Sequence, residues 1–225
     1  ASGRCRSRVS PSHPGDERDI VVYLPSCATR TMGDTRGDRR EPLPEVTVRL
    51  LERAGFTVRI PKNVDELCCG KAFETKGLHD QARAKILEME KALRKASDNG
   101  RHPILCDTSP CLARMKKEIP GLPLFEPIEF ASAFLLPRLR FTPVDRRIAL
   151  HPTCSTRLLG LTDAFMDLAR HLAADVVLPT GILCCGFSGD KGFHRPELNA
   201  SALAGLARQV GGCREGYSTS RTCEI

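Results

Sequence analysis

The sequence predicts an α/β protein built from two pseudo-repeated units, each a small parallel sheet flanked by helices. Short apolar segments alternate with segments of helical periodicity, a pattern typical of parallel strands joined by helical crossovers. Aromatic residues make up 5% of the chain and tryptophan is absent, so the core must be aliphatic. The same order of elements and cysteines occurs twice along the 225 residues. Together these observations favour a duplicated, layered fold.

The first copy begins with an apolar segment at 19–24, which we expect to be a buried strand. Apolar residues then recur at helical spacing from Leu43, and Gly55 is placed where a C-terminal glycine would end that helix. A strand, a long amphipathic helix and a third strand are expected next, at 56–60, 78–96 and 103–106.

The second copy repeats this order. We expect a strand, a helix, a strand and a longer helix at 147–150, 165–172, 175–178 and 196–210. A further strand and helix within 122–139 should link the copies. The sequence therefore divides into an N-terminal flexible tail, a first cysteine-rich unit and a second one, at 1–18, 19–143 and 144–225.

Composition narrows the class of function. The net charge of +7 comes from scattered basic residues without interleaved aromatics, which argues against nucleic-acid binding. The chain has no apolar run of about 18 residues, so we expect no transmembrane segment, and no export signal is visible. Eleven cysteines, an odd number, then favour metal or redox chemistry over disulfides. We expect a cytoplasmic protein, or one peripheral to the inner face of the membrane.

Eight cysteines fall at matching places in the two copies, in loops or at strand ends. They are Cys27, Cys68, Cys69 and Cys111 in the first copy, and Cys154, Cys184, Cys185 and Cys223 in the second. Four thiolates suit either zinc or an iron–sulfur cluster. Adjacent cysteines can share one site only if the backbone turns sharply, and Gly70 and Gly186 permit that turn. We predict that all eight are metal or cluster ligands.

Several of these residues can also be interpreted in another way. Any one cysteine could be a buried small hydrophobe. Cys5, Cys106 and Cys213 have no counterpart in the other copy: we interpret Cys5 as tail, Cys106 as a strand residue or an extra ligand, and Cys213 as structural. His151 could ligate a metal or be satisfied by the backbone.

At these cysteines the chain resembles the family of cysteine-rich CCG domains, which includes subunits of heterodisulfide reductase and glycolate oxidase. Its segments 106–111, 151–154, 184–193 and 216–225 are most similar to the C-terminal region of flavin-dependent D-lactate dehydrogenases. The family carries Cys-Cys-Gly followed by a closing Cys-x-x-Cys. Here Thr108 and Ser220 replace the first cysteine of that closing pair, so we expect a four-thiolate cluster rather than a five-thiolate one.

The resemblance implies an iron–sulfur electron-transfer module, with [4Fe–4S] as the expected cluster. It would pass electrons from a flavin (FAD) that oxidises a D-2-hydroxy acid of the D-lactate or glycolate type towards a quinone or cytochrome. The flavin would belong to another domain or a flavoprotein partner, so the chain would not be an enzyme alone. Zinc in one unit, a zinc-bound docking domain and a heterodisulfide-reductase-like thiol redox subunit remain as alternatives.

Overall fold

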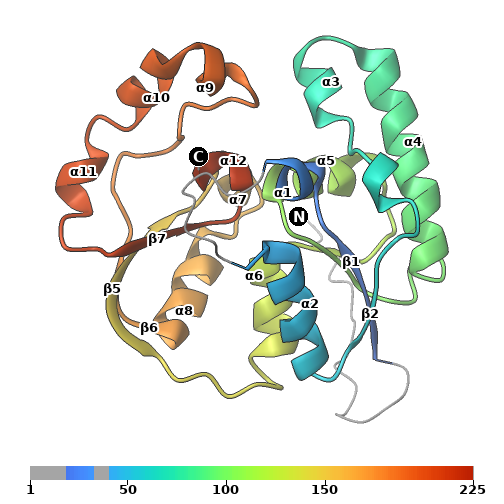
Figure 1. The fold of residues 1–225 in the computed structure, drawn as a ribbon, viewed down its shortest axis with the longest axis horizontal. Helices are drawn as coiled ribbons and strands as arrows, with labels where there is room; N and C mark the ends of the chain where they lie inside the picture. The colour runs from blue at the N-terminus through green and yellow to red at the C-terminus, as the bar shows by residue number, and fades with distance from the viewer. Residues whose placement is uncertain (1–18, 33–40, 225) are drawn as a thin grey trace, which may run out of the picture.

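A computed structural model describes residues 19–32 and 41–224 of the protein. Figure 1 shows two sheets beside one another, each with helices around it. The expected tail at 1–18 lies outside the described residues. The two small parallel sheets confirm the fold predicted from the sequence.

Both sheets are parallel throughout. In the described part of the chain, the first sheet has the strand order β2-β1-β3-β4 and the second β6-β5-β7. The strands are β1 Ile20–Leu24, β2 Thr57–Arg59, β3 Ile104–Cys106, β4 Leu124–Phe125, β5 Val144–His151, β6 Ala173–Val177 and β7 Glu215–Ser218. Because parallel strands end at the same edge of a sheet, the loops that follow them gather there, and open α/β folds build their sites at that edge.

Helices cover both faces of the first sheet. They are α1 Cys27–Thr31, α2 Leu43–Arg53, α3 Lys71–Thr75, α4 His79–Ala96, α5 Ser109–Glu118 and α6 Pro127–Phe130, with short helical turns η1 Val64–Glu66 and η2 Ala131–Leu135. Side chains alternate along β1: Val22 packs with Met89 of α4, and Tyr23 packs with Leu51 of α2 and Phe130 of α6. The sheet is therefore buried on both sides, as an all-parallel sheet requires.

The second unit is smaller. Its helices are α7 Cys154–Leu158, α8 Thr162–Leu172, α9 Lys191–His194, α10 Pro196–Ala202, α11 Leu206–Gln209 and α12 Arg221–Glu224. Leu150 of β5 packs with Phe165 of α8 and with Ile128 of α6. Since Ile128 belongs to the segment that follows the first sheet, the second core is continuous with the linking helix, where the sequence predicts a connection.

A buried cluster of hydroxyl groups joins the units. Ser109, the first residue of α5, is within hydrogen-bond distance of Thr153 at 2.8 Å and of the Thr219 hydroxyl at 3.1 Å. Thr156 and Thr219 hydroxyls lie 2.6 Å apart, and the Ser109 N–H donates to the Thr219 carbonyl at 3.1 Å. All four side chains are buried. We call Ser109, Thr153, Thr156 and Thr219 the hydroxyl cluster; its members satisfy one another where water is excluded.

One expected helix is interrupted. The sequence predicts a single helix over 196–210, but the structure has α10 and α11, separated at 203–205. Gly205 lies at the break, and glycine costs about 1 kcal/mol inside a helix. Neither α10 nor α11 has a buried residue, so packing does not offset that cost.

In the described residues, no helix combines the length and apolar character needed to cross a membrane.

The start of α6 holds a buried acid. Glu126 is fully buried, and its Oε2 accepts a hydrogen bond from the Ile128 N–H at 2.7 Å while its own N–H donates to Glu129 at 3.0 Å. This reciprocal arrangement is a capping box. Burial raises the pKa of Glu126 from 4.5 to about 7.

Stability should therefore depend on this carboxyl. Between pH 4.5 and 7 the unfolded chain loses the Glu126 proton while the folded chain keeps it, so its contribution to the free energy of unfolding falls as the pH rises through that window. Glu126→Gln mimics the neutral acid. We expect the variant to match the wild type near pH 4.5 and to be more stable by about 2–3 kcal/mol at pH 8. Urea unfolding at both pH values measures this, and an unchanged difference between them would contradict it.

Candidate metal centres

The first-unit thiols lie where the chain leaves strands β1 and β3. Cys27 is the first residue of α1, directly after β1, and the Ser26 Oγ caps that helix by accepting the Thr29 N–H at 3.2 Å. Cys111 lies in the first turn of α5, after β3. Cys68 and Cys69 lie between η1 and α3. The four predicted ligands therefore come from three segments at one edge of the sheet.

These four thiols face one another closely enough to shift one another's pKa. The four line one small cavity together with Cys106, the fully buried last residue of β3. Apolar side chains complete its wall: Leu24, Leu67, Met89 and Met115. Cys106, for which the sequence leaves two interpretations, is thus both a strand residue and a neighbour of the predicted ligands.

The thiols cannot all ionise without a positive charge among them. Hydrogen bonds from Cys27 and Cys69 lower the pKa of Cys68 to about 2. The hydrogen bond to Cys68 and burial raise the pKa of Cys27, and the hydrogen bonds to Cys111 and Cys68 raise the pKa of Cys69. Burial raises the pKa of Cys106 as well. A bound cation would reverse this, because coordinated thiols are deprotonated. The donor set therefore fits a soft metal ion or cluster.

A glycine follows each cysteine pair in the left-handed conformation. Gly70 has φ +79° and Gly186 has φ +78°. A Cβ on Gly70 would lie 2.5 Å from the Ala82 carbonyl oxygen of α4, and one on Gly186 would lie 2.5 Å from the Leu198 carbonyl oxygen of α10. Each glycine N–H also donates to the sulfur two residues earlier at 3.3 Å. The sharp turns predicted after the cysteine pairs are present in both units.

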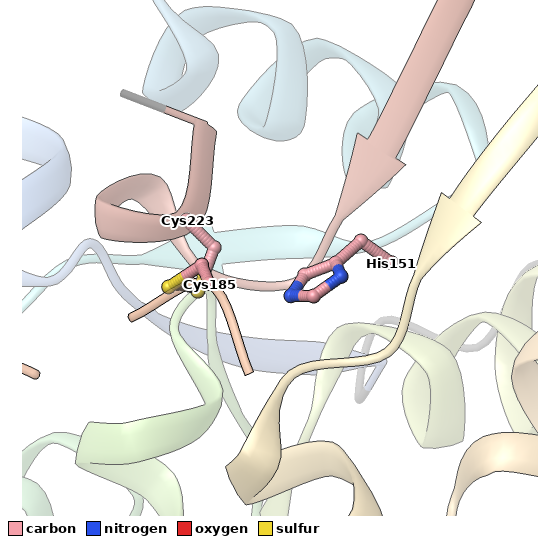
Figure 2. Close-up of side chains that lie close together, drawn as sticks. All are labelled: His151, Cys185 and Cys223. Atoms are coloured by element: carbon pink, nitrogen blue, oxygen red, sulfur yellow. Dashed lines mark hydrogen bonds between the residues drawn. The ribbon is translucent and has the colours of Figure 1, made fainter. Parts of the chain in front are cut away.

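The second unit places its thiols differently. The sulfur atoms of Cys185 and Cys223 lie 3.3 Å apart, and a ring nitrogen of His151 lies within 4.8 Å of both. Figure 2 shows the imidazole at the end of β5 pointing toward the two sulfurs. Cys154 and Cys184 are exposed and lie outside this group. Two of the four predicted ligands are therefore brought together with a histidine.

The charge state of this pair follows from its contact. The thiol of Cys223 lowers the pKa of Cys185 to about 4, and His151 adds to that effect. The pKa of Cys223 is raised by Cys185 and by burial. The contact therefore favours a thiolate at Cys185 beside a thiol at Cys223.

Two residues that the sequence leaves outside the predicted ligand set, His151 and Cys213, lie beside this pair. His151 is given no preference for ligation over a backbone hydrogen bond, yet its Nε2 is buried without a hydrogen-bond partner among the described residues. Its position three residues before Cys154 is the signal that could identify it. Cys213, expected to be structural, is half-buried and lines a cavity of about 350 Å³ with His151, Cys185 and Cys223.

The close approach at Gly70 can be separated from its backbone conformation. Gly77 has a similar φ of +77°, but a Cβ there would have no neighbour within 4 Å. Gly77→Ala should cost about 1 kcal/mol, from the left-handed backbone alone. Gly70→Ala should cost about 1–3 kcal/mol more, because the Cβ must push α4 away. Chemical denaturation of both variants measures the difference; equal losses would show that α4 does not constrain the turn.

Comparisons with known proteins agree with the cysteine pattern. Residues 21–116 match the family model of the cysteine-rich domain CCG. The chain is similar to lactate utilization protein A of Oceanobacillus iheyensis, with 25% identity over 189 residues that cover 76% of this chain and 75% of that protein. It is 30% identical to lactate utilization protein A of Bacillus licheniformis over 164 residues, which cover 64% of this chain and 66% of the relative. The chain therefore contains a CCG cysteine-rich domain and resembles proteins named for lactate utilization.

Proposed function

We propose that this chain is an iron–sulfur electron-transfer module, with a cluster held in the first unit by Cys27, Cys68, Cys69 and Cys111. The observation that carries the proposal is that these four thiols line one cavity at the edge of a parallel sheet, within the segment that matches the CCG domain. A bound cluster would supply one-electron exchange.

The surrounding residues suit that role. The Gly70 N–H donates to the Cys68 sulfur, and such hydrogen bonds help to set the reduction potential of a cluster. Met89 and Met115 provide an apolar wall that limits water. The second unit forms a second centre, where Cys185 and Cys223 meet.

The names of the relatives support a lactate-related role, since both proteins are named for lactate utilization. Together with the resemblance to D-lactate dehydrogenases, these names favour electrons that come from oxidation of a D-2-hydroxy acid such as D-lactate. The chain would receive them from a flavoprotein domain or partner and pass them towards a quinone or cytochrome. It would not oxidise the acid itself.

Iron and acid-labile sulfide should be measured on the chain purified without oxygen. A filled first centre predicts about four irons and four sulfides and an EPR signal after reduction with dithionite. Photoreduced free flavin should produce the same signal if the centre accepts electrons from flavin.

Single cysteine variants assign the ligands. Cys69→Ser and Cys111→Ser should each lose most of the iron and sulfide, because each removes a thiolate from the set. Cys213→Ser is the control, since it lies outside the first unit and should retain the first-unit iron. Zinc without sulfide in the purified chain would refute the electron-transfer role and leave a structural or docking domain.

A further inference from the structure

Three ligand atoms in the second unit converge on one point. The Cys185 and Cys223 sulfurs and a ring nitrogen of His151 all lie within 4.8 Å of one another. Among the residues that the structure describes, no other group of three or more His, Cys, Asp or Glu side chains is this compact. The three come from distant parts of the chain: the end of β5, the cysteine pair before α9, and α12.

The His151 side chain has a buried nitrogen, Nε2, without a hydrogen-bond partner among the described residues. Burying an imidazole nitrogen without a partner is unfavourable, because the hydrogen bond it made to water is not replaced. Figure 2 shows the ring directed toward the two sulfurs. A metal ion between the three side chains would satisfy this nitrogen.

The separation of the two sulfurs fits a single ion. Zinc binds thiolate at about 2.3 Å and imidazole at about 2.0–2.1 Å, so two ligand atoms of one ion lie at most about 4.6 Å apart. The sulfur separation of 3.3 Å is within that limit. The first unit differs, because its four thiols line one cavity without forming a group this compact among the described residues. The CCG match also ends at residue 116, before the second unit begins.

We propose that the second centre binds one divalent transition-metal ion of the zinc class through His151 Nε2, Cys185 and Cys223. The proposal deepens the proposed function at its second centre and is independent of what the first centre holds. Soft thiolates with one imidazole are a ligand set that zinc accepts. The three ligands line the cavity of about 350 Å³, so a fourth coordination position faces that cavity, as in zinc sites that keep a position for water or substrate.

The test uses the full chain purified in the presence of zinc, because zinc-edge X-ray absorption reports zinc whether or not iron is present. We expect about one zinc per chain, with two sulfur neighbours at about 2.3 Å and nitrogen or oxygen neighbours at about 2.0 Å. Chelator competition should show that His151→Ala loses more than tenfold in zinc affinity, since even second-shell losses cost 10–100-fold. Cys185→Ser and Cys223→Ser should lose at least as much.

Matched controls come from the same unit. Cys154→Ser and Cys184→Ser remove exposed thiols outside the group, and His194→Ala removes an exposed histidine, so all three should keep wild-type zinc affinity. If His151→Ala unfolds, His151→Cys still decides the matter: it should retain zinc and change the absorption spectrum from two sulfur neighbours to three.

Two results would overturn the single-ion site. One is a His151→Ala variant that keeps zinc affinity and an unchanged absorption spectrum. The other is iron and sulfide in the second unit that are lost equally in Cys154→Ser, Cys184→Ser, Cys185→Ser and Cys223→Ser, which would establish a four-thiolate cluster there. Loss of iron only in first-unit variants bears on the proposed function and leaves this site unaffected.

Discussion

The glycine after each cysteine pair, which has no Cβ, determines the direction in which the two thiols point. On a regular strand or helix, neighbouring side chains point in different directions, so two adjacent thiols could not both face one site. The left-handed turns at Gly70 and Gly186 bring the backbone against a following helix, α4 or α10, at a distance that no other residue type allows. The same turn points the glycine N–H back at the first sulfur of the pair. One backbone device therefore sets the direction of the thiols, their hydrogen bonding and the packing of the next helix.

The two units differ in how deeply their cysteine side chains are buried. In the first, five cysteines surround a small cavity with apolar walls, where charge on the thiols must be balanced by a cation. In the second, two cysteines are exposed and two lie beside a histidine. The repeated sequence pattern therefore produces two different donor sets from one architecture, because the depth of the loops and the identity of the strand-end residue differ between the copies.

The fold could be predicted from the sequence to a large extent, because its signals are local. Helix α4 begins one residue after the predicted start. It could be predicted because its apolar residues recur at the regular spacing of a helix that packs one face on the core. The break between α10 and α11 could not be predicted from periodicity, because it depends on how little of that segment is buried. The sequence groups the eight cysteines by copy, but it does not show that two of the second copy's four lie apart from the others. Which of them meet His151 depends on how β5, the loop after 182 and α12 pack, and spacing along the chain carries no such information.

The hydroxyl cluster connects the segments that carry the cysteines of both units. Thr153 caps the helix that begins at Cys154, Ser109 begins the helix that carries Cys111, and Thr219 precedes the turn that carries Cys223. Their hydroxyls bond to one another inside the protein. One buried network therefore holds the segments that carry Cys111, Cys154 and Cys223 in fixed positions relative to one another, whichever group fills each site.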